Sequence, residues 1–281
     1  MAWRVYLPSV CRQDGLAGNA GTLGLWRLSV SSHGHSGNDL SGQPLAAHHL
    51  VSGDVARDQP KNGVSALGLQ RVLGLGSYKT AWAMLHKLRR ALVRPGRDRL
   101  RGVVEVDETY WGGEEEGVAG RLTEEKALMM VAAEEDGKGI GRIRLRRVLD
   151  LTRTTLHGFI AQSIDLDSTV RTAGLNAYLG MEGYVHDRQV QRRQPEGEHL
   201  LPRVHRVVSL LKRCLLGTHQ GAIGHEYLDY YLDEFTFRFN RRKSPHRGKL
   251  FYRLAQQAVQ VEPAPFDSLL KPQSLGGGGV K

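Results

Sequence analysis

The sequence contains little cysteine and no long apolar run. Cys11 and Cys214 are its two cysteines in 281 residues, too few for a disulfide framework or for a zinc site built on paired cysteines. No apolar run approaches the roughly 20 residues that a helix needs to cross a bilayer, so no membrane partner is expected. The N-terminus lacks the charged and then apolar pattern of a secretory signal, which favours a cytoplasmic protein.

Negative charge is also scarce. Lys and Arg total 39 against 29 for Asp and Glu, which gives a formal net charge of +10. Such a balance is typical of proteins that bind nucleic acid, although some basic enzymes share it. A hydrophobic content of 40% over this length fits one large or two modest domains with a buried core.

The chain divides into four parts by pattern. Residues 1–60 are rich in Ser, Gly and His and lack any helical or strand period. They are interpreted either as a disordered leader or as a segment translated out of frame. Residues 244–281 are predicted to form a basic C-terminal helix and a frayed tail.

Residues 61–97 predict two short helices around a glycine turn. Leu69, Val72 and Leu73 have helical spacing, and Ser77 is suited to cap a second helix. This arrangement fits a helix-turn-helix, although any small helical hairpin has the same pattern. The side chains expected to contact DNA phosphates here are Tyr78, Lys79, Lys87, Arg89 and Arg90.

Residues 98–243 alternate strand and helix patterns. Strands are expected at 103–107, 127–133, 142–149 and 170–172 and around 184–186, with short helices at 152–164 and 175–179. Three consecutive strands, then strands separated by helices, give the order of a ribonuclease H-like α/β domain. Two helices follow, at 198–216 and 225–244, and the second ends on the basic run Arg241, Arg242 and Lys243, which is also expected to contact DNA.

The first strand carries an unusual pair of acids. Alternation sends Glu105 and Asp107 to one face of the sheet and Val104 and Val106 to the other. Acids at such positions are either solvated on an open sheet face or held in a site.

Four blocks carry a family resemblance: "VEVDETYWGG", "TAGLNAYLGMEGYVH", "LPRVHRVVSLLKR" and "YLDEFTFRFNRR". In this order and spacing, over about residues 61–259, the chain resembles the bacterial insertion-sequence transposases of the ISXO-like DDE group. The resemblance implies a ribonuclease H-like domain that cleaves and joins DNA. It also implies double-stranded DNA as the partner, both terminal repeats and target, a homo-oligomer on that DNA, and a place at the bacterial nucleoid.

The resemblance further implies a site for two divalent ions, Mg²⁺ or Mn²⁺. It places the first acid at Asp107, the third ligand at His205 and a phosphate-binding lysine at Lys212. Imidazole is a poorer Mg²⁺ ligand than carboxylate, so His205 would bind Mn²⁺, act through water or position the nucleophile. The alternatives are a solvated helix histidine at 205 and an ordinary exposed lysine at 212.

The chain departs from the family pattern at the second acid. The group has Thr-Asp-Gly where this sequence has Thr172, Ala173 and Gly174. Ala173 therefore occupies the second metal position with no oxygen to offer, and the copy is expected to be severely impaired. Asp165 and Asp167 precede the strand and are expected at its far end, and Asp187 is a weaker substitute.

A second departure lies upstream. Members of the group begin with a zinc ribbon of paired cysteines, which this chain lacks. Back-translating the text that usually follows the ribbon and shifting it by two bases gives Ser-Gly-Asn-Asp-Leu-Ser, which stands at 36–41. This supports a frameshift near 59–60. Two other functions stay open: a non-catalytic DNA-binding remnant or domesticated protein, and another ribonuclease H-like nuclease.

Overall fold

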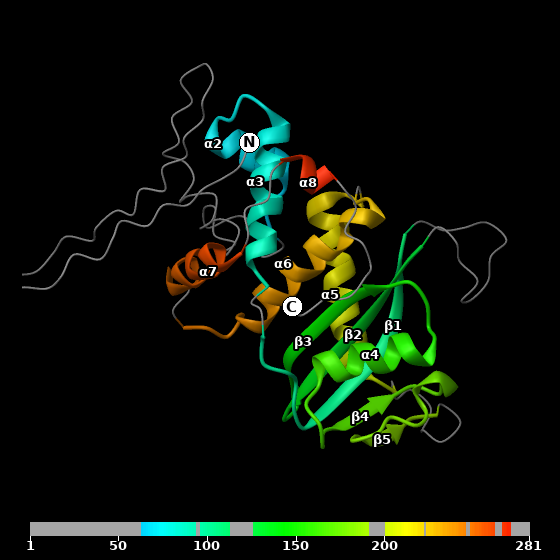
Figure 1. Cartoon of the computed structure of the whole chain (residues 1–281). Coiled ribbons are helices and arrows are strands. Elements are labelled where there is room, and N and C mark those ends of the chain that lie inside the picture. Colours follow the sequence, from blue (N-terminus) through cyan, green and yellow to red (C-terminus); the bar gives the residue numbers. More distant parts are fainter. Residues whose placement is uncertain are drawn as a thin grey trace, which may run out of the picture.

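The chain is built around one five-stranded sheet, seen in a computed structural model (Figure 1). The structure describes residues 63–93, 96–112, 126–190, 200–221, 223–245, 248–261 and 266–270. The interpretations given to residues 1–60 lie outside these ranges. The strands are β1 (Val103–Trp111), β2 (Ala127–Asp136), β3 (Gly139–Val148), β4 (Thr169–Thr172) and β5 (Val185–Arg188).

The strand order is β3-β2-β1-β4-β5. β2 is antiparallel to both β1 and β3, β4 is parallel to β1, and β5 is parallel to β4. This mixed sheet confirms the predicted ribonuclease H-like α/β class. The strand boundaries differ from the prediction, since β1 continues to Trp111 and β2 to Asp136. The helix expected at 175–179 is a single 3-10 turn, Asn176–Tyr178.

Helices cover both faces of the sheet (Figure 1). α4 (Arg153–Ser163), whose N-cap Thr152 accepts a hydrogen bond from the Thr155 amide, covers the face that carries Val104 and Val106. α5 (Pro202–His219) and α6 (Leu228–Asn240) cover the other face. Burial on both faces explains the continuous apolar run at the start of β2.

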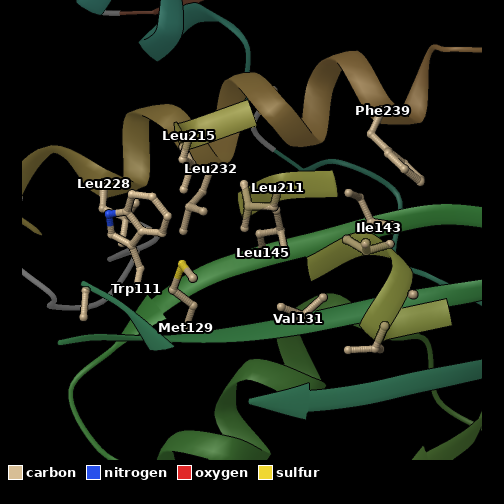
Figure 2. Close-up of a cluster of buried hydrophobic side chains, with 14 of the residues drawn as sticks. Trp111, Met129, Val131, Ile143, Leu145, Leu211, Leu215, Leu228, Leu232 and Phe239 are labelled. Atoms are coloured by element: carbon tan, nitrogen blue, oxygen red, sulfur yellow. The ribbon is translucent and has the colours of Figure 1, made fainter. Parts of the chain in front are cut away.

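The core under α5 and α6 is built from alternate strand residues. Trp111 and Met129 pack with Leu215 and Leu228 at one end, and Ile143 packs near Phe239 at the other (Figure 2). α6 therefore runs from the Trp111 end of the sheet toward Ile143.

Four helices form a layer beyond the sheet: α2 (Ala66–Leu73), α3 (Tyr78–Ala91), α7 (Gly248–Gln260) and α8 (Phe266–Leu270). Ser65 caps α2 by accepting the Gly68 amide at 3.0 Å, and Gly74 ends it in the left-handed conformation with φ 62°. Leu69 and Leu85 pack with Phe237 of α6 and Leu254 of α7. The hairpin predicted at 61–97 thus shares its core with the last helices of the chain.

A buried ion pair joins α3 to α6 and corrects one prediction. The Arg89 Nε donates to the Glu234 carboxylate at 2.7 Å, and the two side chains are 2% and 5% exposed. The Arg89 guanidinium also lies 4.2 Å from the centre of the Tyr231 ring. Arg89 therefore lies in the interior, and the prediction that it contacts DNA phosphates is wrong.

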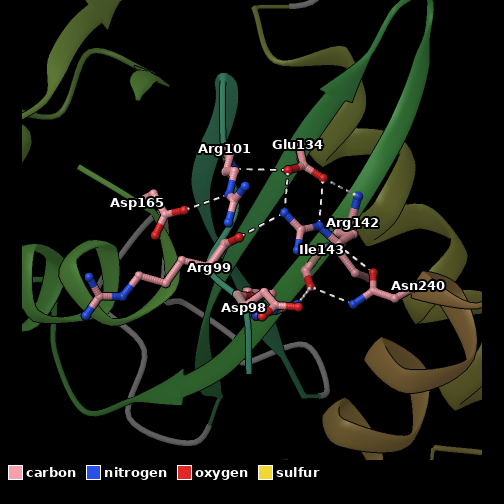
Figure 3. A network of polar contacts seen from close by, with 9 residues as sticks. Asp98, Arg99, Arg101, Glu134, Arg142, Ile143, Asp165 and Asn240 are labelled. Carbon is pink, nitrogen blue, oxygen red and sulfur yellow. Dashed lines mark hydrogen bonds and ion pairs between the residues drawn. The ribbon is translucent and has the colours of Figure 1, made fainter. Parts of the chain in front are cut away.

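Side chains of α6 and the turn after it cover the free edge of β3 (Figure 3). The Asn240 side chain accepts from the Ile143 amide at 2.7 Å and donates to the Ile143 carbonyl at 3.1 Å. The Asp229 carboxylate accepts the Arg147 amide at 3.2 Å. α6 thus supplies hydrogen-bond partners to an edge strand that would otherwise present unpaired backbone groups.

The basic run after α6 has partners within the fold. Arg242 donates to the carbonyls of Gly141 and Ile140, and burial lowers the pKa of its guanidinium. Arg241 stacks 3.7 Å from the centre of the Phe237 ring. Arg242 is half-buried and part of its donor capacity is used within the fold, and DNA contact by it stays a prediction. Lys243 is 68% exposed and pairs with Asp136 at 2.6 Å, so DNA contact by it stays a prediction.

Candidate active site at the edge between β1, β4 and α5

The parallel pairing of β1 and β4 brings two predicted site positions together. Val103 pairs with Thr169, and the register continues to Val106 with Thr172. The next pair along this register is Asp107 and Ala173, which directly follows β4. Both side chains are half-buried, and Ala173 packs against the core under α5 and α6. Ala173 therefore stands beside Asp107 on the face of the sheet that α5 covers.

The start of α5 is fixed to the same face by Glu105. The Glu105 carboxylate is fully buried and accepts the backbone N–H groups of Arg203 at 2.8 Å and Val204 at 3.0 Å. The Arg203 guanidinium donates to the other carboxylate oxygen at 3.0 Å. Of the two explanations for the strand acids, the solvated one is excluded for Glu105.

The geometry of β1 and α5 sets the level of Asp107. Glu105 lies at the first turn of α5, and Trp111 packs with Leu215 further along it, so strand and helix run side by side in one direction (Figure 2). Two strand residues advance about 7 Å, which equals roughly four to five helix residues. Asp107 is therefore level with the stretch of α5 from 205 to about 209.

His205 and Lys212 share one side of α5. Both line a shallow groove of about 770 Å³ with Val208, Ser209, Arg213 and Leu216. His205 is exposed and Lys212 is half-buried, while Val204, Val207 and Leu211 point into the core. The spacing of seven residues has thus placed the imidazole and the ammonium on a common surface, as the sequence predicted.

The other nearby acids have different partners. Asp187 of β5 is on the same sheet face as Glu105, but it accepts from Arg171 at 2.7 Å and from Gln189 at 2.6 Å. Asp165 pairs with Arg101 at 2.9 Å, before the first residue of β1. Neither carboxylate takes the place of the oxygen that Ala173 lacks.

The donor set does not fit a pair of divalent ions. Within the described ranges, no three His, Cys, Asp or Glu side chains come close enough together to hold a metal ion. Mg²⁺ is usually anchored by shared carboxylates, and here Asp107 supplies one while position 173 supplies none. The β1–β4 register brings positions 107 and 173 together, so the absence of a carboxylate at 173 follows from residue type alone.

The residues predicted to contact DNA on α3 lie in different environments. Tyr78 and Lys79, at the start of the helix, are exposed. Lys87 and Arg90 are half-buried, and burial lowers the pKa of the Lys87 ammonium to about 8. The exposed N-terminal end of α3 is therefore the part of this helix that a phosphate reaches most easily.

The sequence of the sheet and its covering helices matches a known family. The model of the ISXO2-like transposase domain matches residues 99–240, half of the chain. The chain belongs to the ISXO2-like transposase family. This match confirms the resemblance carried by the four sequence blocks. Three of the blocks lie wholly within the matched range, and the fourth lies within it except for its last two residues.

More distant likenesses are to a solved intasome and to solved transposase assemblies. A simian T-cell lymphotropic virus intasome in complex with PP2A regulatory subunit B56 gamma has 14% identity, covering 74% of this chain and 72% of that chain, with TM-score 0.32. The Mos1 transposase paired-end complex and the pre-cleavage Mos1 transpososome have 11% and 13% identity, each covering 83% of both chains with TM-score 0.27. Likenesses this distant leave the family match as the finding that identifies the chain.

No curated protein matches the sequence. In the part of the chain that the structure describes, no helix is both long and apolar enough to span a bilayer.

The sequence did not reveal that Glu105 and Arg203 belong together. Leu201, the N-cap residue of α5, makes no side-chain capping bond, and Pro202 follows it. A helix that begins without Ser, Thr, Asp or Asn at its N-cap often finds its hydrogen-bond acceptor elsewhere in the fold. The missing side-chain cap on α5, together with an acid two residues before Asp107, was the sequence signal that could have predicted the contact between Glu105 and α5.

Proposed function

We propose that this ISXO2-like transposase is a metal-dependent DNA strand-transfer enzyme whose present copy is impaired at one position. Asp107 and His205 are the remaining metal ligands, and Lys212 is a phosphate contact. A bound pair of ions would stabilise charge on the attacking and leaving oxygens at phosphorus. The observation that carries the proposal is the β1–β4 register, which sets Ala173 beside Asp107.

Surface charge supports DNA as the substrate. Within the described residues, α5 contains no Asp or Glu, and Arg206, Lys212 and Arg213 lie on its solvent side or at its edge. Tyr78 and Lys79 add an exposed contact region at the start of α3. Cations on such surfaces bind phosphates without regard to sequence, so this DNA binding is independent of the defect at 173.

The test is to restore the missing carboxylate. Ala173→Asp should raise nicking of terminal-repeat DNA with Mg²⁺ or Mn²⁺ by orders of magnitude, because two carboxylates then face the same site. Asp107→Ala in that background should abolish the gain. Gly174→Asp is the matched control, since a side chain there meets no atom within 4 Å but carries its carboxylate one residue further along the chain.

The outcome also decides between the alternatives. If Ala173→Asp is folded, binds the DNA and still does not nick, position 173 is not a metal position, and a non-catalytic DNA-binding protein becomes the better reading. If the restored protein cleaves RNA or junctions in preference to terminal-repeat DNA, the chain is a nuclease of another kind.

A further inference from the structure

A chain of alternating charges crosses the sheet beneath the candidate site. Arg203 bridges Glu105 at 3.0 Å and Glu135 at 2.7 Å, Glu135 also pairs with Arg171 at 2.7 Å, and Arg171 pairs with Asp187 at 2.7 Å. Five elements contribute one residue each: β1, α5, β2, β4 and β5. We infer that this network is a positioning device that sets the spacing of the three site positions, an inference that rests on the proposed function.

The placement of the network along the chain supports this role. Each site position follows a network residue by two: Asp107 follows Glu105, Ala173 follows Arg171, and the third position, 205, follows Arg203. In a strand, residues two apart lie on one face, so Glu105 and Arg171 share a face with the two strand positions of the site. The hydrogen bonds that Glu105 accepts from the first turn of α5 fix the position of that turn along β1, and therefore the position of residue 205.

Glu105 is the one fully buried member of the network. Glu105 is 0% exposed, and both of its oxygens are already engaged, one by two helix N–H groups and the other by the Arg203 guanidinium. A carboxylate at a helix N-terminus is also favoured by the partial positive charge of the unpaired N–H groups. Arg203 further donates to the carbonyls of Gly137 and Gly139 at 3.0 and 3.1 Å, which ties the β2–β3 turn to the same point.

Arg171, which pairs with both Glu135 and Asp187, is held in its charged form. Burial by itself would lower the pKa of Arg171, but the hydrogen bond to Asp187 and the charges of Glu135 and Asp187 raise it. Charged groups with matched partners in a partly buried site keep one arrangement, because any other leaves a charge uncompensated. Glu105, Glu135, Arg171 and Arg203 are thus positioning residues and do not bind the metal themselves.

The first experiment measures spacing and needs neither metal nor activity. Spin labels on Ala173→Cys and Ser209→Cys, in a chain with Cys11→Ala and Cys214→Ala, report the distance between the end of β4 and α5. Glu105→Gln should broaden or shift this distance distribution, because an amide cannot hold both Arg203 and the helix amides as a carboxylate does. Arg203→Lys is the second variant, measured in the same way if Glu105→Gln does not fold.

The matched control is Glu134→Gln (Figure 3). Glu134 is next to Glu135 but faces the other side of the sheet, and it too accepts two backbone amides, from Arg101 at 2.9 Å and Arg142 at 3.0 Å, and a guanidinium at 2.9 Å. It should lose stability as Glu105→Gln does and leave the 173–209 distance unchanged. An unchanged distance in both folded network variants overturns the inference.

The second experiment measures Mn²⁺ binding in the Ala173→Asp background. Glu105→Gln should weaken Mn²⁺ about 10–100-fold, the effect typical of residues that orient metal ligands, while Glu134→Gln should not. Equal Mn²⁺ affinity in Glu105→Gln and its parent overturns the positioning role. If the distance shifts but Ala173→Asp binds no Mn²⁺, the network stands as the device that sets the spacing, and the proposed metal site is what fails.

Discussion

Removing the buried Arg89 guanidinium should destabilise the protein strongly. Arg89→Met leaves the Glu234 carboxylate, 5% exposed, with Arg238 at 3.8 Å as its nearest cation. An uncompensated buried charge costs about 3–5 kcal/mol, and the remaining Arg238 places the expected loss near 3 kcal/mol. In a folded unit of this size, that lowers Tm by roughly 6–12 °C.

The double variant Arg89→Met/Glu234→Leu should recover most of this loss. Replacing a buried pair with apolar groups of similar volume is often neutral or stabilising. Arg101→Ala is the control, because the Arg101–Asp165 pair is 73% and 37% exposed and should change stability by less than about 1 kcal/mol. Denaturant unfolding of the four proteins checks these values, and a double variant as unstable as Arg89→Met would refute the ion-pair reasoning.

The same proteins test whether Arg89 contacts DNA. Each phosphate contact adds about 0.9 to the slope of log affinity against log salt. Arg89→Met/Glu234→Leu should keep the slope of the parent, since the Arg89 side chain is 2% exposed. Lys79→Ala, at the exposed start of α3, should lower it by about one. A slope reduced by one unit in the folded double variant would return Arg89 to the DNA interface.

Two further predictions concern stability. Burial first, and then the Arg89 charge, lowers the pKa of His86 to about 2 and that of His219 to about 4. Both histidines are neutral in the folded protein above about pH 4.5, but in the unfolded chain they take up protons below about pH 6.5. As the pH falls below 6.5, each histidine should therefore lower the free energy of unfolding by about 1.4 kcal/mol per pH unit. His86→Leu should remove about 1.4 kcal/mol per pH unit from the slope in denaturant titrations between pH 6.5 and 4.5, and an unchanged slope would show that other groups set it. Asn240→Ala leaves the Ile143 amide without its side-chain acceptor, while the Ile143 carbonyl keeps the bond from Arg144 Nη1 at 2.9 Å. The lost acceptor should cost about 1–3 kcal/mol and speed hydrogen exchange at Ile143, and slow exchange there in the variant would contradict this.

The sequence by itself determined the family, the fold class and the faces of the main strands. Alternation placed Glu105 and Asp107 on one face of β1, as the structure has them. The seven-residue spacing placed His205 and Lys212 on one side of α5. These features are local, because strand and helix periods follow from backbone geometry within a few residues.

Only the tertiary structure decided which charged residues are available to a partner. The sequence predicts that Arg89 and Arg242 are exposed cations. In the structure, Arg89 pairs with a carboxylate 145 positions away in the sequence, and Arg242 donates to two carbonyls that are 101 and 102 positions away. The cap of α5 comes from Glu105, 98 residues before Arg203. Local patterns report neighbours within about one helix turn or strand pair, whereas a buried charge takes whichever partner the packed elements bring to it. The sequence gives the residue types at 105, 107 and 173. Their separate roles depend on how β1, β4 and α5 pack together, which only the tertiary structure shows.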